Sequence, residues 1–353
     1  MNIGIIGCGN ISPIYFKNFA RFGLKVAACA DVFMSAAEKR GAEYNVPAVT
    51  VDQLLADPSI GLVLNITVPA AHGDVALQAL SAGKHVYNEK PLALTRDQAK
   101  QMLALATSKN LRVGCAPDTF LGAGLQTCRR LIDEGAIGRP VAATAFMLGH
   151  GPEGWHPNPE FFYKIGAGPM FDMGPYYLTA LVNLLGPVKR VTGSAQISLA
   201  ERTIGSEPKK GQKIVVETPT HVVGVLDFLQ GTVATLITSF DVWGHNLPRI
   251  EIYGSEGSLS CPDPNTFGGP IQIRKWNEKT WEDVPLDPGH TVDSRGLGPR
   301  DLIQAVADNR AHRASGALAY HVLDLMHAVH DASREGRHIT LESTCDRPAK
   351  FAD

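Results

Sequence analysis

The sequence lacks several features that mark particular classes of protein. None of its six cysteines forms a Cys-x-x-Cys pair, which argues against a zinc ribbon and against a thioredoxin motif. Its twelve histidines include no His-Glu-x-x-His pair, and His150 and His156 are too loosely spaced to name a metal site. No internal repeat, block of like charges or low-complexity linker interrupts the chain. We therefore expect no bound metal.

An excess of charge is also missing. The 33 Lys and Arg residues nearly balance 35 Asp and Glu residues, for a formal net charge of -2, so no basic surplus favours nucleic acid or an acidic membrane as a partner. No apolar run is long enough to span a membrane, and Met1 leads into an apolar strand without the basic segment of a signal peptide. Several cysteines lie in apolar runs as small core residues. These observations predict a protein of the reducing cytoplasm.

The length of 353 residues and a hydrophobic content of 44% predict an ordinary globular chain of about two domains. Strands and helices alternate as far as Pro117, which predicts a doubly wound parallel sheet of the α/β class in a first domain, residues 1–118. Further on, successive strand-like runs with short turns predict an α+β domain, residues 119–353, with a large, mostly antiparallel sheet. Such a sheet needs its second face covered by helices or by another subunit.

A glycine-rich turn follows the first predicted strand, Asn2–Ile6. It reads Gly7-Cys8-Gly9-Asn10-Ile11-Ser12 and opens a predicted helix. Gly7 allows a tight turn, and Gly9 lets the backbone approach a pyrophosphate at the helix N-terminus. Ser12 replaces the usual third Gly or Ala. Taken alone the pattern is weak, because tight turns also select glycine.

Asp31 ends the second predicted strand at the spacing expected of a ribose-binding acid. A carboxylate there accepts hydrogen bonds from ribose hydroxyls and repels a 2′-phosphate, which favours NAD over NADP. Lys39 and Arg40 are nearby cations that soften this preference. The alternative is that Asp31 caps a helix or a turn.

Two later strands also end in polar residues. The first is followed by Thr67-Val68-Pro69 and His72, and the second by Tyr87-Asn88-Glu89-Lys90-Pro91. Chemistry gathers at this end of the strands in open α/β sheets. By themselves, Glu89 and Lys90 are as well explained by an exposed ion pair at a solvated strand end, and His72 by a structural role at a helix start.

The predicted second domain contributes a helix and a loop. Asp172 and Tyr176 are four residues apart at the start of an apolar helix, which places them on one face. Before it, residues 149–168 are rich in Gly, Pro and aromatics, among them Trp155, His156 and Tyr163. Such a loop is either a substrate lid or a packed surface loop.

Taken in order, these motifs resemble those of the Gfo/Idh/MocA oxidoreductases, and the resemblance extends to the C-terminal helix around residues 319–325. It implies Lys90 as the catalytic lysine beside the nicotinamide, with Asp172 and Tyr176 on the substrate side. The implied cofactor-binding residues are Gly7, Gly9, Asn10, Ile11, Asp31, Thr67, Pro69, His72, Glu89 and Lys90. The implied substrate-binding residues are Trp155, His156, Tyr163, Asp172 and Tyr176.

The resemblance implies an NAD-dependent dehydrogenase or reductase acting on a sugar, a cyclitol or a derivative. Two alternatives stay open: a glycosidase or lyase that retains NAD and acts by transient oxidation, and a cofactor-binding regulator. Tyr176 stands where inositol dehydrogenase-like members have histidine, so either Tyr176 or Lys90 moves the proton. Both are poor bases at their ordinary pKa values near 10 unless nearby charges lower them. We also expect a homodimer or homotetramer joined through the C-terminal sheet.

Overall fold

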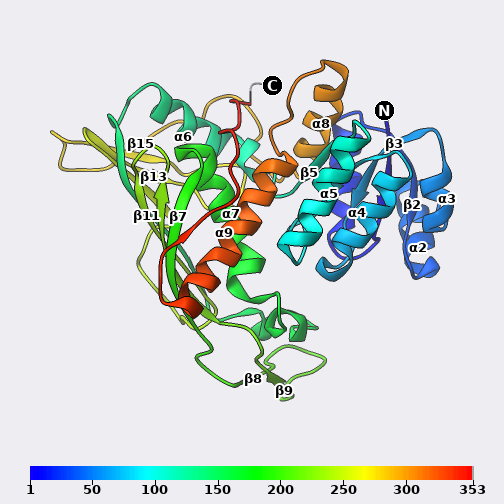
Figure 1. Cartoon of the computed structure of the whole chain (residues 1–353), viewed down its shortest axis with the longest axis horizontal. Helices are drawn as coiled ribbons and strands as arrows, with labels where there is room; N and C mark the ends of the chain where they lie inside the picture. The colour runs from blue at the N-terminus through cyan, green and yellow to red at the C-terminus, as the bar shows by residue number, and fades with distance from the viewer. Residues whose placement is uncertain (352–353) are drawn as a thin grey trace. The chain divides into compact units, whose positions relative to one another are not determined.

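The computed structural model describes residues 1–351, which form two compact units (Figure 1). Unit 1 comprises residues 1–121 and 293–323, and unit 2 comprises residues 122–292 and the chain from residue 324 onward. The sequence predicted one boundary near residue 118. The structure differs in that residues 293–323 return to the first unit. None of the helices in residues 1–351 is long and apolar enough to cross a membrane.

Unit 1 is built on a five-stranded parallel sheet, as predicted. Its strand order is β2-β1-β3-β4-β5, and every neighbouring pair is parallel. The strands are β1 (Asn2–Ile6), β2 (Val26–Ala30), β3 (Ile60–Asn65), β4 (His85–Asn88) and β5 (Val113–Cys115). The chain reverses its direction of winding between β1 and β3. In open α/β sheets, ligands bind outside the carboxyl ends of the strands at such a point.

The helices of unit 1 follow the strands in alternation. They are α1 (Ser12–Arg21), α2 (Met34–Tyr44), α3 (Val51–Ala56), α4 (His72–Ser81), α5 (Arg96–Ser108) and α8 (Leu297–Ala307), with short 3-10 turns η1 (Pro69–Ala71) and η2 (Thr119–Leu121). Thr95 caps α5 by accepting a hydrogen bond from the Gln98 amide. A full capping box between Thr50 and Gln53 begins α3. Side-chain caps therefore set where these two helices start.

The returning segment attaches to the β5 edge of the unit 1 sheet. The Cys115 amide donates to the Ala314 carbonyl at 3.1 Å, and Gly114 forms an isolated bridge with Ser315. Hydrogen bonds between far-separated parts of the chain therefore decide which unit holds residues 293–323. Helical periodicity identifies a helix in this stretch but carries no information about the sheet that it joins.

Unit 2 contains a mixed sheet of nine strands. The order is β15-β14-β13-β12-β6-β11-β10-β7-β16; β6 and β11 are parallel and the other pairs are antiparallel. The strands are β6 (Pro140–Leu148), β7 (Val188–Gln196), β10 (His221–Phe228), β11 (Val233–Ser239), β12 (Ile250–Gly254), β13 (Gly257–Cys261), β14 (Gln272–Lys275), β15 (Glu282–Asp283) and β16 (Ile339–Thr340). A separate hairpin, β8 (Glu201–Thr203) with β9 (Lys213–Val215), was not predicted.

One face of this sheet is covered by helices. Along β10, Val222 and Leu226 are fully buried, whereas Val223 and Val225 on the opposite face are only half-buried. The buried face packs against α7 (Gly168–Leu185) and the second half of α9 (Gly316–Glu335), and α6 (Ala123–Asp133) packs on α7. Figure 1 shows α7 and α9 beside the sheet. Burial therefore alternates along β10, and within residues 1–351 the face opposite these helices is only half-buried.

Candidate functional site

The glycine loop joins β1 to α1 at the reversal point of the unit 1 sheet. Gly7 has φ of +105°, and a Cβ there would lie 2.6 Å from the Ile66 carbonyl group, so only glycine fits this turn. A Cβ on Gly9 would meet no atom of the protein within 4 Å. The loop is therefore closed toward β3 and open above Gly9, the arrangement that allows a pyrophosphate to approach the backbone. Asn10 and Ile11 follow, exposed at the start of α1.

Asp31 lies beside this loop at the end of β2. Its Oδ2 accepts a hydrogen bond from the Cys8 amide at 2.8 Å, and its Oδ1 accepts one from the Phe33 amide at 2.9 Å. Each carboxylate oxygen has a further lone pair for a ribose hydroxyl. The structure thus brings the predicted acid and the predicted loop together, and these residues fit the ribose and pyrophosphate of NAD.

His72 connects the loops that follow β3 and β4. Its Nδ1 lies 2.7 Å from the Pro91 carbonyl oxygen and its Nε2 lies 3.1 Å from the Thr67 carbonyl oxygen. The side chain is only 1% exposed, and this burial lowers its pKa. Since both ring nitrogens face backbone oxygens, we assign His72 to holding these loops together rather than to the direct cofactor contact implied by the resemblance.

The Thr67 loop is held from a second side by Asn65. Thr67 Oγ1 donates to Asn65 Oδ1 at 2.7 Å, and Asn65 Nδ2 donates to Asn88 Oδ1 at 3.0 Å. Asn88 Nδ2 in turn donates to the Leu92 carbonyl at 2.9 Å. The cofactor-binding candidates Thr67 and Pro69, which begins η1, therefore sit on a loop fixed by buried amides.

At the end of β4, Glu89 is buried, with 8% of its surface exposed. Tyr15 donates its hydroxyl to Glu89 Oε1 at 2.6 Å, and the Lys90 amide donates to Oε2 at 2.9 Å. Burial raises the pKa of Tyr15 well above its ordinary value, so Tyr15 remains a donor. The interpretation of Glu89 and Lys90 as a solvated strand end is therefore wrong for Glu89, whose carboxylate anchors the backbone that carries Lys90.

Asp118, which follows β5, is a buried acid that the sequence analysis did not identify. Asp118 Oδ2 accepts hydrogen bonds from the amides of Gly296 and Gly298, at 2.8 and 2.9 Å, and so caps α8. Burial raises the pKa of Asp118 to about 6 although these two amides favour the carboxylate. Its partners follow about 180 residues later in the chain, so no local pattern predicts the contact.

Asp118 predicts a specific pH dependence of stability. Between its ordinary pKa of 3.8 and its folded value of about 6, the folded state retains a proton that the unfolded chain has lost. Stability from this group is therefore greatest at low pH and falls as the pH rises through this window. Compared with Asp118→Asn, the natural protein should lose about 1 kcal/mol of unfolding free energy between about pH 5 and about pH 7. Urea unfolding at several pH values measures this; parallel profiles would contradict it.

In unit 2, Asp172 and Tyr176 lie one turn apart on α7, as predicted. The helix starts at Gly168, whose φ is +82° and where a Cβ would lie 2.8 Å from the Pro219 carbonyl oxygen. Two arginines hold its other end, because Arg347 Nε and Arg129 Nη1 both donate to the Asn183 carbonyl, at 2.9 and 3.0 Å. The candidate substrate-side residues therefore stand on a helix fixed at both ends.

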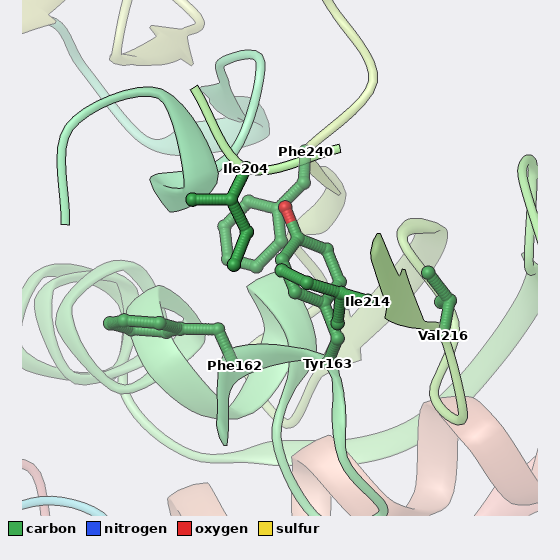
Figure 2. Packing of buried hydrophobic residues seen from close by; sticks show 6 residues of the cluster. All are labelled: Phe162, Tyr163, Ile204, Ile214, Val216 and Phe240. Carbon is green, nitrogen blue, oxygen red and sulfur yellow. The ribbon is translucent and has the colours of Figure 1, made fainter. Parts of the chain in front are cut away.

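Tyr163 belongs to the core of unit 2. It is fully buried in a cluster with Phe162, Ile204, Ile214, Val216 and Phe240 (Figure 2). Its hydroxyl donates to Glu153, and burial raises its pKa. The substrate contact implied for Tyr163 is therefore replaced by a packing role. An aromatic residue in a loop gives no sequence signal of which of these roles it has.

Trp155 and His156 lie in the same loop but nearer to solvent. Trp155 is 69% exposed. The His156 ring makes edge contacts with the rings of Trp155, Phe161 and Phe162, at centroid distances of 5.3–5.5 Å. Its Nδ1 accepts a hydrogen bond from the Asn158 amide at 3.0 Å. An exposed indole beside a cluster of aromatic rings suits the face of a sugar ring.

Arg202, which the sequence did not single out, fixes this loop. It is buried, with Nη2 2.6 Å from Glu153 Oε1 and Nη1 2.7 Å from Asp241 Oδ1. It also donates to the carbonyls of His150 and Phe240, both at 2.8 Å. The β8–β9 hairpin, which carries Arg202, thereby ties the loop to the end of β11. The acids lie about 40 to 50 residues away in the chain, so no spacing rule finds the group.

Both units contain candidate catalytic and binding residues. Gly7, Asp31, Glu89 and Lys90 belong to unit 1, and Asp172 and Tyr176 belong to unit 2. Within residues 1–351 no group of three or more His, Cys, Asp or Glu side chains is arranged to hold a metal ion.

Comparisons with known proteins agree with this geometry. Residues 1–116 match the family model described as an oxidoreductase family with an NAD-binding Rossmann fold, GFO/IDH/MocA. Residues 125–260 match the model of the GFO/IDH/MocA C-terminal domain. The two matched stretches together make up more than half of the chain and lie on the two units described above.

Relatives with named activities include 1,5-anhydro-D-fructose reductase of Ensifer adhaerens, which is 28% identical over 74% of this chain and 76% of the relative. Levoglucosan dehydrogenase of Pseudarthrobacter phenanthrenivorans is 25% identical over 73% of each chain. A structure of levoglucosan dehydrogenase in complex with NADH superimposes with a TM-score of 0.85, at 21% identity, over 97% of this chain and 99% of that one. With both family models matched, the chain belongs to the Gfo/Idh/MocA family of oxidoreductases, and its N-terminal part is an NAD-binding Rossmann fold.

Proposed function

We propose that this oxidoreductase transfers a hydride between NAD and the carbinol or carbonyl carbon of a sugar, a cyclitol or a derivative. Relatives named for 1,5-anhydro-D-fructose, levoglucosan and inositol support the substrate class. The observation that carries the proposal is Lys90. It stands at the carboxyl end of β4 in an NAD-binding fold, on a backbone anchored by the buried Glu89. A protein that only binds the cofactor has no need of an ammonium group there.

The residues of unit 1 divide the work of holding the cofactor. Gly7 and Gly9 shape the loop for the pyrophosphate, and Asp31 provides the acceptor for the ribose hydroxyls. Thr67 and Pro69 lie on the loop that His72 and Asn65 hold in place. When bound, NAD supplies the carbon that accepts or gives up the hydride.

The remaining chemistry is the movement of the hydroxyl proton. We assign the transfer of this proton to Tyr176. Lys90 binds the reacting hydroxyl of the substrate, and its positive charge lowers the pKa of that hydroxyl. Asp172, one turn before Tyr176 on α7, orients the polyhydroxylated substrate by accepting hydrogen bonds from its hydroxyl groups. Lys90 is the alternative proton carrier. The kinetics of the variants described in the Discussion separate the two.

A substrate screen tests this function. The protein is incubated with NAD or NADP and a panel of sugars, glycosides and cyclitols, and the absorbance of the reduced nicotinamide is followed. We expect NADH to accumulate with at least one polyhydroxylated substrate, and NAD to be preferred. Release of a cleaved sugar without net NADH would instead establish the NAD-retaining glycosidase or lyase reaction. A preference for NADP would contradict the role of Asp31.

We also propose that the chain forms a homo-oligomer through the open face of the unit 2 sheet. Val223, Ile237 and Phe146 face one another in register across β10, β11 and β6, and all three are half-buried on the face without helices. An apolar row across the middle of an open sheet favours a second copy of the same surface.

The mass in solution tests this proposal. Light scattering at micromolar concentration should give a dimer or a larger assembly, and Ile237→Glu should dissociate it by placing a charge in the middle of the row. Val215→Glu is the matched control, because Val215 is exposed on β9 outside the nine-stranded sheet. A monomeric natural protein would contradict the proposal, as would equal dissociation by both variants.

The cysteines support a reducing compartment. All six are free and buried in the part of the chain that the structure describes, so each serves as a small core residue. We infer a cytoplasmic location on this basis.

A further inference from the structure

Helices α1 and α2 of unit 1 contact each other beside the glycine loop. Ser12 and Phe16 lie one turn apart on α1, and Arg40 and Tyr44 lie one turn apart on α2. The rings of Phe16 and Tyr44 stack with centroids 4.7 Å apart and planes only 5° from parallel. This stack fixes the register of the two helices and brings Arg40 to Ser12.

The Arg40 guanidinium consequently lies on the glycine loop. Its Nε donates to Ser12 Oγ at 3.0 Å, and its Nη2 lies 3.4 Å from the Gly9 carbonyl oxygen. The same hydroxyl of Ser12 donates to the Gly9 carbonyl at 2.7 Å. The serine that departs from the usual glycine motif therefore has a role here: it connects the loop to a cation on α2.

A third group occupies the remaining edge of the guanidinium. Arg40 Nη1 forms an ion pair with Glu43 Oε2 at 2.6 Å, and this bond lowers the pKa of Glu43. Asp31 lies beside the same loop, since its Oδ2 accepts a hydrogen bond from the Cys8 amide at 2.8 Å. The loop thus has an acidic residue, Asp31, and a basic residue, Arg40, beside it. These are the residue types that bind a ribose hydroxyl and a ribose phosphate, respectively.

We propose that Arg40 determines how this site treats a phosphate on the adenosine ribose, and that Glu43 restrains it. An arginine binds phosphate best with two parallel N–H groups. Because Glu43 forms an ion pair with Nη1, Arg40 cannot offer that N–H group to a phosphate. With Glu43 in place, Arg40 serves the loop and the site favours NAD. When Glu43 is replaced by a neutral side chain, no carboxylate competes for Nη1, and this edge of Arg40 can turn to the 2′-phosphate of NADP.

A double-mutant cycle tests this by binding alone. The dissociation constants of NAD and NADP are measured by isothermal titration calorimetry, at one fixed ionic strength, for the natural protein, Glu43→Gln, Arg40→Met and the double variant. Glu43→Gln should tighten NADP binding about 10-fold relative to NAD, the effect of one added charge-assisted contact. In the double variant this gain should disappear. Arg40→Met alone should weaken the binding of NAD and NADP to a similar degree, because in the natural protein Arg40 supports the loop and Glu43 keeps it from the phosphate.

Lys39 provides the matched control. It precedes Arg40 and is exposed, so Lys39→Met removes the same charge without touching the loop. The gain from Glu43→Gln should survive in the Lys39→Met background. A gain that persists without Arg40, or that is absent in Glu43→Gln, would overturn the proposal. Because the measurement needs no substrate, its outcome is independent of the sugar or cyclitol assignment.

Discussion

Lys90→Ala is expected to lower kcat/KM for the sugar or cyclitol by about 10²–10⁴-fold or more while NAD still binds. The ammonium group is lost, but the backbone of residue 90 remains attached to Glu89 Oε2 through its amide. The contacts expected for the pyrophosphate and the ribose of the cofactor lie on Gly7, Gly9 and Asp31, none of which changes. Steady-state kinetics give the loss of turnover, and a fluorescence titration gives the dissociation constant of NAD.

Lys109→Ala is the control for the loss of one positive charge. Lys109 ends α5, where its Nζ donates to the Ser81 carbonyl at 3.0 Å, away from the carboxyl ends of the strands. It should retain normal kinetics. If Lys90→Ala keeps near-normal turnover, or if NAD binding is lost together with turnover, Lys90 does not have the catalytic role proposed for it.

Tyr176→Phe is expected to reduce turnover by about 10²–10⁴-fold, the usual contribution of a positioned general acid or base. Tyr176 is buried on α7, and phenylalanine keeps the ring and its packing while removing the hydroxyl. The basic limb of the pH profile for oxidation should change at the same time. Both kcat and KM are measured over pH, because a binding residue would alter KM alone.

Tyr177→Phe offers a control on the same helix. Tyr177 is almost fully buried, and burial raises its pKa, so its hydroxyl is a poor proton carrier at neutral pH. Turnover and the pH profile should be close to normal in this variant. Near-normal kcat in Tyr176→Phe with only a raised KM would assign the proton to Lys90 or Asp172.

The sequence predicted those parts of the site that depend on local structure. Gly7 and Asp31 each follow directly after a strand, and Lys90 is the second residue after one. Parallel strands bring such positions to one edge of a sheet. Asp172 and Tyr176 were placed on one helix face by their spacing alone. The parallel sheet of unit 1 was predicted from the alternation of strands with helices, and the mostly antiparallel sheet of unit 2 from successive strands joined by short turns.

The sequence did not predict features that depend on partners distant in the chain. Asp118 caps α8 from about 180 residues away, and Arg202 pairs with acids about 40 to 50 residues away on either side. The roles of His72 and Tyr163 depended on what surrounds the side chain. His72 was implied as a cofactor contact, yet both of its nitrogens face backbone carbonyls. The local sequence does not indicate the surroundings of either side chain.

The most direct test of the central claim is to follow the hydride itself. A substrate found in the screen is labelled with deuterium at the carbinol carbon, and the reduced nicotinamide is isolated after turnover and analysed by mass spectrometry. Our account predicts deuterium in the NADH formed by the natural protein, at a rate reduced by the factor given above in Lys90→Ala. Deuterium released to water instead, or NADH formed without the label, would contradict it.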